Sequence, residues 1–321
     1  MTRISGITPS GHVQLGNYLG AIRRWAADGD RDDLYFISDL HAMTTQHNPA
    51  RLRSLTREQF AVLLAAGIDP DAVFVQSDLI AEHASLTWVL ECVCTFGEAR
   101  RMIQFKEKSA GTESVRLSLL TYPVLMAADI LLSGANEVPV GEDQSQHVEL
   151  ARTLARRFNG TYGDVFTVPR PVLPKAAARI RDLADPDRKM AKSAHDSAGV
   201  IFLLDSPDLV RRKVSRAVTD SGSDVAHEPD TRPGVANLLD ILAACTGTTP
   251  EQAALGIDGY AMLKEQVTEA VIAELTPVRE RTTALLDDPA ELDRVRQAGA
   301  ERARQRARPR LAAALRLTGL G

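Results

Sequence analysis

The stretch DLYFISD, residues 33–39, is a short apolar run that ends in polar residues, as a buried strand does before a turn. The run AVFVQSD, residues 72–78, repeats this pattern. Between them, ARLRSLTREQFAVLLAAG at residues 50–67 has helical periodicity and ends at a glycine. A strand, a helix and a second strand in this order favour parallel strands joined by a crossover helix.

A third strand-like run, EVPVGED at residues 137–143, leads into a helical pattern over residues 144–160. The alternation predicts an α/β fold of the Rossmann-like, doubly wound class, with a mainly parallel sheet covered on both faces. Ligands of such sheets bind beyond the carboxyl ends of the strands. The polar endings TPSG, SDLH, QSD and GED fall there, so we expect the binding site at that edge.

Beyond the lysine-containing segment near residue 190, almost every stretch has the pattern of an amphipathic helix joined to the next by a polar loop. We therefore expect a Rossmann domain over residues 1–190 and an all-helical domain over residues 191–289. A last helix, about residues 290–321, can pack back on the first domain. Residues 292–321 hold eight arginines and two acids, which fits either a solvated helix face or a contact with RNA phosphates.

The composition is that of an ordinary globular protein of 321 residues with a net charge of -4, which gives no general nucleic-acid footprint. The three cysteines form no CxxC pair and no zinc pattern, so we expect reduced thiols in apolar space and no metal site. There is no run of about 18 apolar residues. We expect a cytoplasmic protein with no membrane or DNA partner.

Two cationic segments stand out. DRKMAKSAHD, residues 187–196, places Lys189 and Lys192 in a polar loop between the two expected domains, and MIQFKEKSAG, residues 102–111, carries Lys108. Either loop alone reads most simply as solvated charge. A loop with two ammonium groups can also close over a triphosphate and stabilise the charge of departing pyrophosphate. No nucleophile lies beside a base, which favours chemistry by positioning and electrostatics.

A carboxylate lies in an otherwise apolar segment, LLTYPVLMAADILLSG at residues 119–134. An unpaired buried charge costs several kcal/mol, so Asp129 needs a partner. Two readings stay open: a structural salt bridge or cap, or an acceptor for a donor group on an apolar ligand. A pocket built to bind a substrate N–H rejects analogues that lack it by about 10⁴ or more.

The stretch ITPSGHVQLGNYLG, residues 7–20, places small residues before a helix, where backbone N–H groups and the helix dipole favour an anion. It has neither the Walker spacing nor a GxGxxG pattern. Any phosphate bound here would take its cationic partners from elsewhere in the chain. His12 is more simply a loop histidine.

These segments resemble bacterial tryptophanyl-tRNA synthetases in order and spacing, through PSGHVQLGNYLGA, ISDLHAMT, MIQFKEKSAG, LLTYPVLMAADILL, VPVGEDQSQHVELARTLARRFN, KMAKS and AVTDS…RPGVANLLDIL. The resemblance implies a class I aminoacyl-tRNA synthetase, a helical domain that reaches the tRNA anticodon, and a homodimer. It implies that tryptophan and ATP give an adenylate and pyrophosphate, after which tryptophan passes to the terminal ribose of tRNA(Trp).

The resemblance also implies roles for single residues. Lys108, Lys189 and Lys192 would act on the triphosphate and the leaving pyrophosphate, with Mg²⁺ held mainly by phosphate oxygens. The ATP contacts would be Thr8, Pro9, Ser10, Gly16, Asn17, Gly141, Glu142, Asp143, Ile180, Lys189, Met190, Ala191, Lys192 and Ser193. The tryptophan site would be formed by Asp129, which would accept the indole N–H, with Gln144, Tyr122, Met126, Val138, Val140 and His41.

Three positions depart from the family pattern. Ala191 replaces the first serine of KMSKS, and Thr8 stands where many members have glutamine. Gln14, the first residue of the family's first signature at residues 14–17, stands where many classes have His or Thr. We expect activity with altered ATP handling. One alternative is a catalytically silent relative that binds tryptophan or ATP as a sensor, but such a protein has no need of the three lysines. A tyrosine enzyme is a second alternative, disfavoured by Asp129 in its apolar setting.

Overall fold

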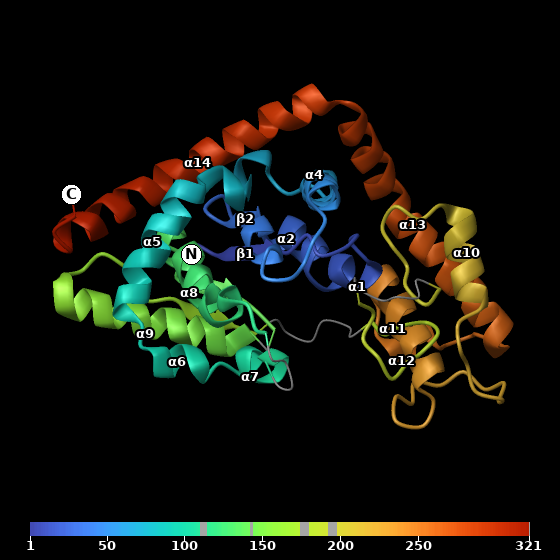
Figure 1. Cartoon of the computed structure of the whole chain (residues 1–321). Coiled ribbons are helices and arrows are strands. Elements are labelled where there is room, and N and C mark those ends of the chain that lie inside the picture. Colours follow the sequence, from blue (N-terminus) through green and yellow to red (C-terminus); the bar gives the residue numbers. More distant parts are fainter. Residues whose placement is uncertain (110–113, 142–143, 174–179, 192–197, 321) are drawn as a thin grey trace.

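A computed structural model of the chain describes residues 1–109, 114–141, 144–173, 180–191 and 198–320, without the side chain of Lys108 (Figure 1). The roles expected for Glu142, Asp143, Lys192 and Ser193, and for the Lys108 ammonium group, fall outside this description. The strands are β1 (Ile4–Ile7), β2 (Leu34–Ile37), β3 (Val73–Val75), β4 (Glu137–Pro139) and β5 (Arg170–Val172).

The sheet is parallel and has the strand order of a doubly wound fold. β1 pairs with β2 and β2 with β3, while β4 pairs with β5. A parallel bridge between Arg3 and Glu137 places β4 beside β1. The order is therefore 3-2-1-4-5, which reverses between β1 and β4, as in Rossmann folds. The predicted fold class is confirmed.

Both faces of the sheet are buried, which explains why the strands read as continuous apolar runs. Ile37, Val73 and Val75 belong to one core cluster together with α4. Phe36 and Phe74 point to the other face, into a cluster shared with α5, α8 and α9. Because successive side chains of a strand point to opposite faces, three short strands contribute residues to two separate cores.

The helices of the first part are α1 (Leu15–Asn17), the π-helical turn η1 (Tyr18–Ile22), α2 (Arg23–Asp28), α3 (Asp39–Ala42), α4 (Pro49–Ala65), η2 (Pro70–Ala72), η3 (Gln76–Leu79), α5 (Ile80–Val93), α6 (Phe96–Arg100), α7 (Ile103–Ser109), α8 (Leu117–Ser133) and α9 (Ser145–Tyr162). The helices predicted over residues 50–67 and 144–160 are confirmed by α4 and α9. Among the described residues, no helix is long and apolar enough to cross a membrane.

The remaining helices are α10 (Pro207–Ser215), α11 (Pro233–Thr246), α12 (Pro250–Ala253), α13 (Gly259–Asp287) and α14 (Pro289–Leu317). α10 and α11 both contact α13, and α13 also lies against α4. This helical part therefore shares the core cluster of one sheet face (Figure 1). The division into domains at residues 190 and 289 stays a prediction.

The C-terminal helix α14 runs back across the first part of the chain and contacts β3, α5 and α8 (Figure 1). Its close approach to the edge strand depends on Gly299, because a Cβ built there would lie 2.0 Å from the Val73 carbonyl oxygen. A helix laid along the β3 edge covers strand groups that would otherwise be open to pairing.

Most of the arginines of α14 bind protein groups of the first part. Arg296 makes a bidentate pair with Asp78 at 2.7 Å, and Arg302 bonds to Asp71. The remaining pairs across this contact are Arg304 and Arg308 with Glu82, and Arg306 with Asp32. The reading as a plain solvated face does not describe these residues, because their side chains attach the helix to the first part of the chain. A contact of this helix with RNA phosphates stays a prediction.

Candidate active site

A cavity of about 540 Å³ lies at the carboxyl edge of the sheet, where the strand order reverses between β1 and β4. Thr8 and Ser10 reach it from the loop after β1, and Val138 and Val140 reach it from β4 and the residues that follow. Ligands of open α/β sheets bind in the crevice at such a reversal. The expected position of the binding site agrees with this geometry.

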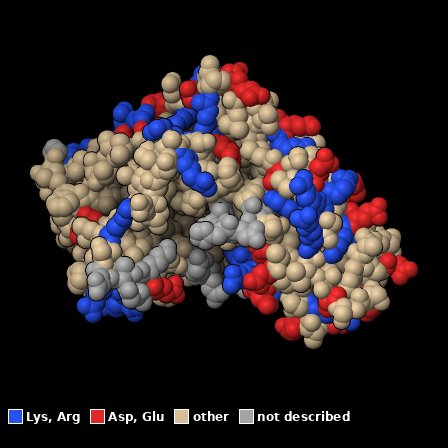
Figure 2. All heavy atoms as spheres, turned by 45° about the vertical axis from the view of Figure 1, so that its right-hand side comes forward, with Lys and Arg blue, Asp and Glu red and all other residues tan. Residues whose placement is uncertain are grey.

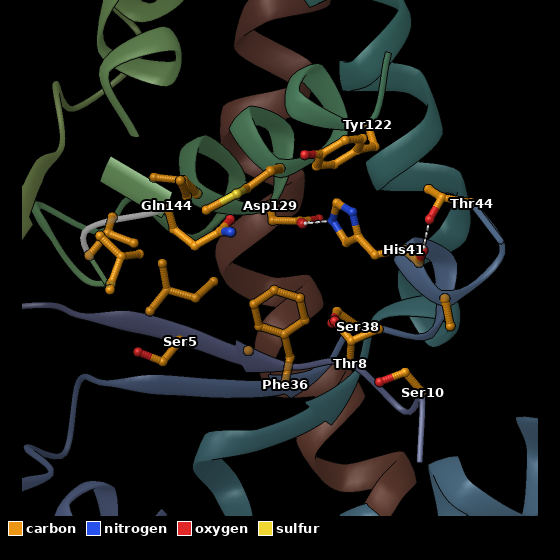
Figure 3. A pocket seen from close by; sticks show the side chains of 18 of the residues that line it. Ser5, Thr8, Ser10, Phe36, Ser38, His41, Thr44, Tyr122, Asp129 and Gln144 are labelled. Atoms are coloured by element: carbon orange, nitrogen blue, oxygen red, sulfur yellow. Dashed lines mark hydrogen bonds and ion pairs between the residues drawn. The ribbon is translucent and has the colours of Figure 1, made fainter. Parts of the chain in front are cut away.

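Many of the predicted site residues lie on the wall of this one cavity (Figure 3). They are Thr8, Ser10, His41, Tyr122, Met126, Asp129, Val138, Val140, Gly141 and Gln144. The whole predicted tryptophan set thus faces the same space as Thr8, Ser10 and Gly141 of the predicted ATP set. Their individual roles stay predictions.

The sheet side of the cavity is apolar because of Phe36, which the sequence analysis missed. Its ring stacks on that of Phe74, with centroids 5.4 Å apart and planes at 15°. Gly6 on β1 makes room for the ring, since a Cβ at Gly6 would lie 2.7 Å from it. With Met126 and Val138 on other walls, the space suits a flat aromatic group.

Asp129 supplies an acceptor in this apolar space, although only 2% of its surface is exposed. His41 Nε2 lies 2.8 Å from Oδ2, Gln76 Nε2 donates to Oδ1 at 2.7 Å, and His83 Nδ1 lies 2.9 Å from Oδ1. Burial alone would raise the pKa of Asp129, but the hydrogen bond from His41 and the contact with His83 hold that pKa well below the usual carboxyl range. The carboxylate therefore has structural partners and also faces the cavity.

The first signature is held to the lysine-containing segment by Gln14, whose side chain is buried. Its amide oxygen accepts from the N–H groups of Gly16 and Asn17 and so caps α1. Its amide nitrogen donates to the Met190 carbonyl oxygen at 2.8 Å. One side chain thus joins two segments that are 176 residues apart.

Gly16 is required by packing within the protein. A Cβ at this position would lie 2.9 Å from the Gln14 amide oxygen and 3.2 Å from Cβ of Ile180. The Met190 N–H donates to the Ile180 carbonyl oxygen. Ile180, the lysine-containing segment and α1 are therefore packed together. In this arrangement the Ile180 and Met190 side chains are 2% and 1% exposed.

Several predicted ATP residues lie outside the cavity wall: Pro9, Gly16, Asn17, Ile180, Lys189, Met190 and Ala191. Lys189 is exposed and makes no ion pair within the described part of the chain. His12, the loop histidine, contacts the Glu58 carboxylate at 2.8 Å. In the portion of the chain that the structure describes, no group of three His, Cys, Asp or Glu side chains is placed to hold a metal ion.

Comparison with known proteins agrees with these features. A family model described as tRNA synthetases class I (W and Y) matches residues 1–276. The "Tryptophan--tRNA ligase 1" of Streptomyces coelicolor is 57% identical, with 100% of this chain and 98% of that protein covered. The ligase of the same name from Streptomyces avermitilis is 54% identical, with 100% and 99% covered.

Two solved structures are similar over the whole chain. Tryptophanyl-tRNA synthetase from Mycoplasma pneumoniae has a TM-score of 0.85 and 35% identity, with 100% of this chain and 98% of that chain covered. The Campylobacter jejuni enzyme, solved with ADP and tryptophan, has a TM-score of 0.85 and 31% identity, with 100% of both chains covered. The resemblance to bacterial tryptophanyl-tRNA synthetases is confirmed. The chain belongs to the class I tRNA synthetase (W and Y) family.

Proposed function

We propose that this chain is a tryptophan--tRNA ligase that activates tryptophan with ATP and transfers it to tRNA(Trp). The observation that carries the proposal is the buried carboxyl group of Asp129 on the wall of a cavity that also presents Phe36, Met126 and Val138, at the edge of the sheet where Rossmann folds bind nucleotides. Relatives that bear this name cover the whole chain, and one similar structure was solved with ADP and tryptophan.

On the tryptophan side, Asp129 accepts the indole N–H while Phe36, Met126 and Val138 enclose the ring. Gln144 helps to hold the amino group, and His41, Tyr122 and Val140 complete the walls. A buried acceptor beside apolar side chains selects an aromatic ring that carries a donor, because any other ring leaves the remaining acceptor position of the carboxylate unused.

On the ATP side, the loop after β1 and the start of α1 face the nucleotide through Thr8, Pro9, Ser10, Gly16 and Asn17. Gly141, Glu142, Asp143 and Ile180 frame the ribose and adenine, and Met190, Ala191 and Ser193 add contacts from the lysine-containing segment. A tryptophan carboxylate oxygen attacks the α-phosphorus, and the bond to the bridging oxygen of the leaving pyrophosphate breaks.

The charge that develops on pyrophosphate is stabilised by Lys108, Lys189 and Lys192. The exposed Lys189, without an ion-pair partner among the described residues, is free to turn toward the triphosphate. When bound, Mg²⁺ would be held mainly by phosphate oxygens. The protein's own contribution to this step is positioning and electrostatics.

The helical part over residues 191–289 is proposed to reach the tRNA anticodon. Figure 2 shows Lys and Arg side chains gathered on the face that this part turns forward. On α10, Arg212 is exposed, as is Arg216 just after it, whereas the exposed Arg211 pairs with Glu269 of α13. Exposed cations of this kind suit contacts with phosphates, which position a nucleic acid without reading its sequence.

A homodimer and a cytoplasmic location complete the proposal. Trp88 and Phe96 are 65% and 67% exposed. Cys92 lies one turn after Trp88 on α5 and is also exposed, so the expectation that this cysteine fills apolar space within the chain is wrong. Large exposed apolar side chains in one region are typical of a surface that a partner covers. Sedimentation of the purified protein tests the dimer, and a monomer at micromolar concentration would contradict it.

The activity is tested by charging bulk bacterial tRNA with labelled amino acids. We expect tryptophan, and not tyrosine, to be attached, and to one acceptor species. The variant Asp129→Asn is expected to lower kcat/KM for tryptophan by at least about tenfold while leaving KM for ATP within about twofold. Charging with tyrosine, or no charging with tryptophan, would overturn the proposal.

A further inference from the structure

Two side chains that do not line the cavity hold Asp129 from behind. Gln76 comes from η3, directly after β3, and His83 comes from α5. They are 0% and 2% exposed. Both approach the same carboxylate oxygen, Oδ1: Gln76 Nε2 donates at 2.7 Å and His83 Nδ1 lies at 2.9 Å. The cavity-facing acceptor is thus supported by residues that no ligand in the cavity contacts.

Gln76 is fixed at both ends of its amide group. While its nitrogen donates to Asp129, its oxygen accepts from the Leu40 N–H at 3.1 Å, at the start of α3. The next residue, His41, contacts the other carboxylate oxygen, Oδ2, at 2.8 Å. An exchange of the amide oxygen and nitrogen would break both bonds, so the orientation of Gln76 is determined.

His83 is fixed by stacking. Its ring lies parallel to that of Phe74, with centroids 6.5 Å apart and planes at 12°. Phe74 in turn stacks on Phe36, which lines the cavity. The stacked rings of His83, Phe74 and Phe36 therefore connect the side chain behind Asp129 to the apolar wall of the cavity.

The two carboxylate oxygens of Asp129 have different neighbours. Each oxygen has room for about two hydrogen bonds. Oδ1 accepts a hydrogen bond from Gln76 and has His83 Nδ1 packed 2.9 Å from it, whereas Oδ2 has only His41 among the described residues. One acceptor direction is left, and it belongs to the oxygen on the His41 side, where the cavity lies (Figure 3).

We propose that Gln76 and His83 are positioning residues that hold Asp129 in this single-acceptor orientation and thereby set the selectivity for an aromatic ring with an N–H group. The inference rests on the proposed function, because it concerns the residue that would accept the indole N–H. Without the two supports the carboxylate turns about its terminal bond, Oδ1 is left unpaired, and the acceptor no longer points at the ring nitrogen.

The test compares tryptophan with its benzothienyl analogue, in which sulfur replaces the ring N–H, in ATP–pyrophosphate exchange. The variant Gln76→Met keeps the length of the side chain and removes the donor and the acceptor. We expect the preference for tryptophan over the analogue, as a ratio of kcat/KM values, to fall by about tenfold or more. The loss should lie in the tryptophan reaction, with KM for ATP within about twofold.

A second variant, His83→Phe, keeps the stacking on Phe74 and removes the contact with Asp129, so it serves if Gln76→Met fails to fold. The control is Thr282→Val, which removes a fully buried hydroxyl from α13, away from the cavity. We expect it to leave the preference unchanged. A preference that is unchanged in both folded test variants, or equal losses for both substrates, would overturn the inference.

The inference and the proposed function fail in different ways. If the wild-type enzyme catalyses no exchange with tryptophan, the proposed function is wrong. If the wild-type enzyme prefers tryptophan strongly and both folded test variants keep that preference, Asp129 does not depend on its supports and only this inference is wrong.

Discussion

Two cationic segments of the chain, α14 and the lysine-containing segment at residues 187–191, are built in opposite ways. In α14 the arginines are used within the molecule: Arg296 grips Asp78 with two bonds of 2.7 Å, and Arg302 bonds to Asp71. Lys189 is exposed and makes no ion pair within the described residues. The backbone around Lys189, by contrast, is tied down, through a bridge to Arg181 and the Gln14 bond to Met190.

The difference shows what each charge is for. A cation that holds two elements together needs a carboxylate partner in the folded chain, and that partner neutralises it. A cation that acts on a departing pyrophosphate has to be unneutralised until the substrate arrives, on a backbone that is already in place. Local charge density does not distinguish the two cases, but the presence of partners does.

The largest expected effect is that of Lys189→Ala. We expect the rate of ATP–pyrophosphate exchange at saturating substrates to fall by about 10²-fold or more, while the melting temperature stays within about 1 °C of wild type. Steady-state exchange and thermal unfolding measure the two quantities. A large loss of stability without a loss of rate would show that Lys189 has a structural role, like the arginines of α14.

The reverse behaviour is expected of Gly299→Ala. A methyl group there would meet the Val73 carbonyl oxygen, so α14 must shift away from β3. We expect a loss of about 1–3 kcal/mol in the free energy of unfolding, measured with urea, with the exchange rate of the folded enzyme unchanged. Gly160, where an added Cβ meets nothing within 4 Å, is the matched control for a helical glycine. Equal losses in the two variants would contradict the close approach.

A smaller loss is expected of Arg296→Gln, which removes a half-buried bidentate pair. We expect about 1–2 kcal/mol in the free energy of unfolding, more than for an exposed pair because the carboxylate of Asp78 loses its main partner. Arg294→Gln is the control, because Arg294 is 70% exposed and, among the residues that the structure describes, pairs only with Glu291 on its own helix. A loss in the control as large as that of Arg296→Gln would show that surface pairs matter as much.

The smallest effect is expected on RNA binding. Replacing Arg302, Arg304 and Arg306 by glutamine should leave the dependence of tRNA affinity on salt concentration unchanged, because their guanidinium groups bind Asp71, Glu82 and Asp32. Each lost phosphate contact would reduce the slope of log K against log salt by about one. A reduction of two or three would return these residues to the RNA-contact reading.

The sequence predicted the fold where the signal is local. Phe36 and its neighbours lie in an apolar run that ends in polar residues, and α4 has both its period and a final glycine. β5 was missed because three residues with Pro171 at the centre carry no strand pattern. The role of α14 could not be predicted, since Asp71 and Asp78 lie more than 200 residues from their arginines.

The sequence motifs predicted residues of the cavity wall, but not Gln76 and His83, which lie behind Asp129. Asp129 stands out as a charge among apolar residues, and the structure places it on the cavity wall. Gln76 and His83 carry no such signal, because a polar residue after a strand and a histidine in a helix have many uses. Only the packing of η3 and α5 behind α8 reveals that they share one carboxylate oxygen.

The central claim is that the cavity with Asp129 and the three lysines proposed to act on pyrophosphate together activate tryptophan. Exchange of labelled pyrophosphate into ATP, with each amino acid added in turn, tests it most directly, because it needs both sites and no tRNA. We predict exchange that depends on tryptophan and is at least about 10³-fold slower with tyrosine. No exchange with tryptophan, or faster exchange with tyrosine, would contradict this account.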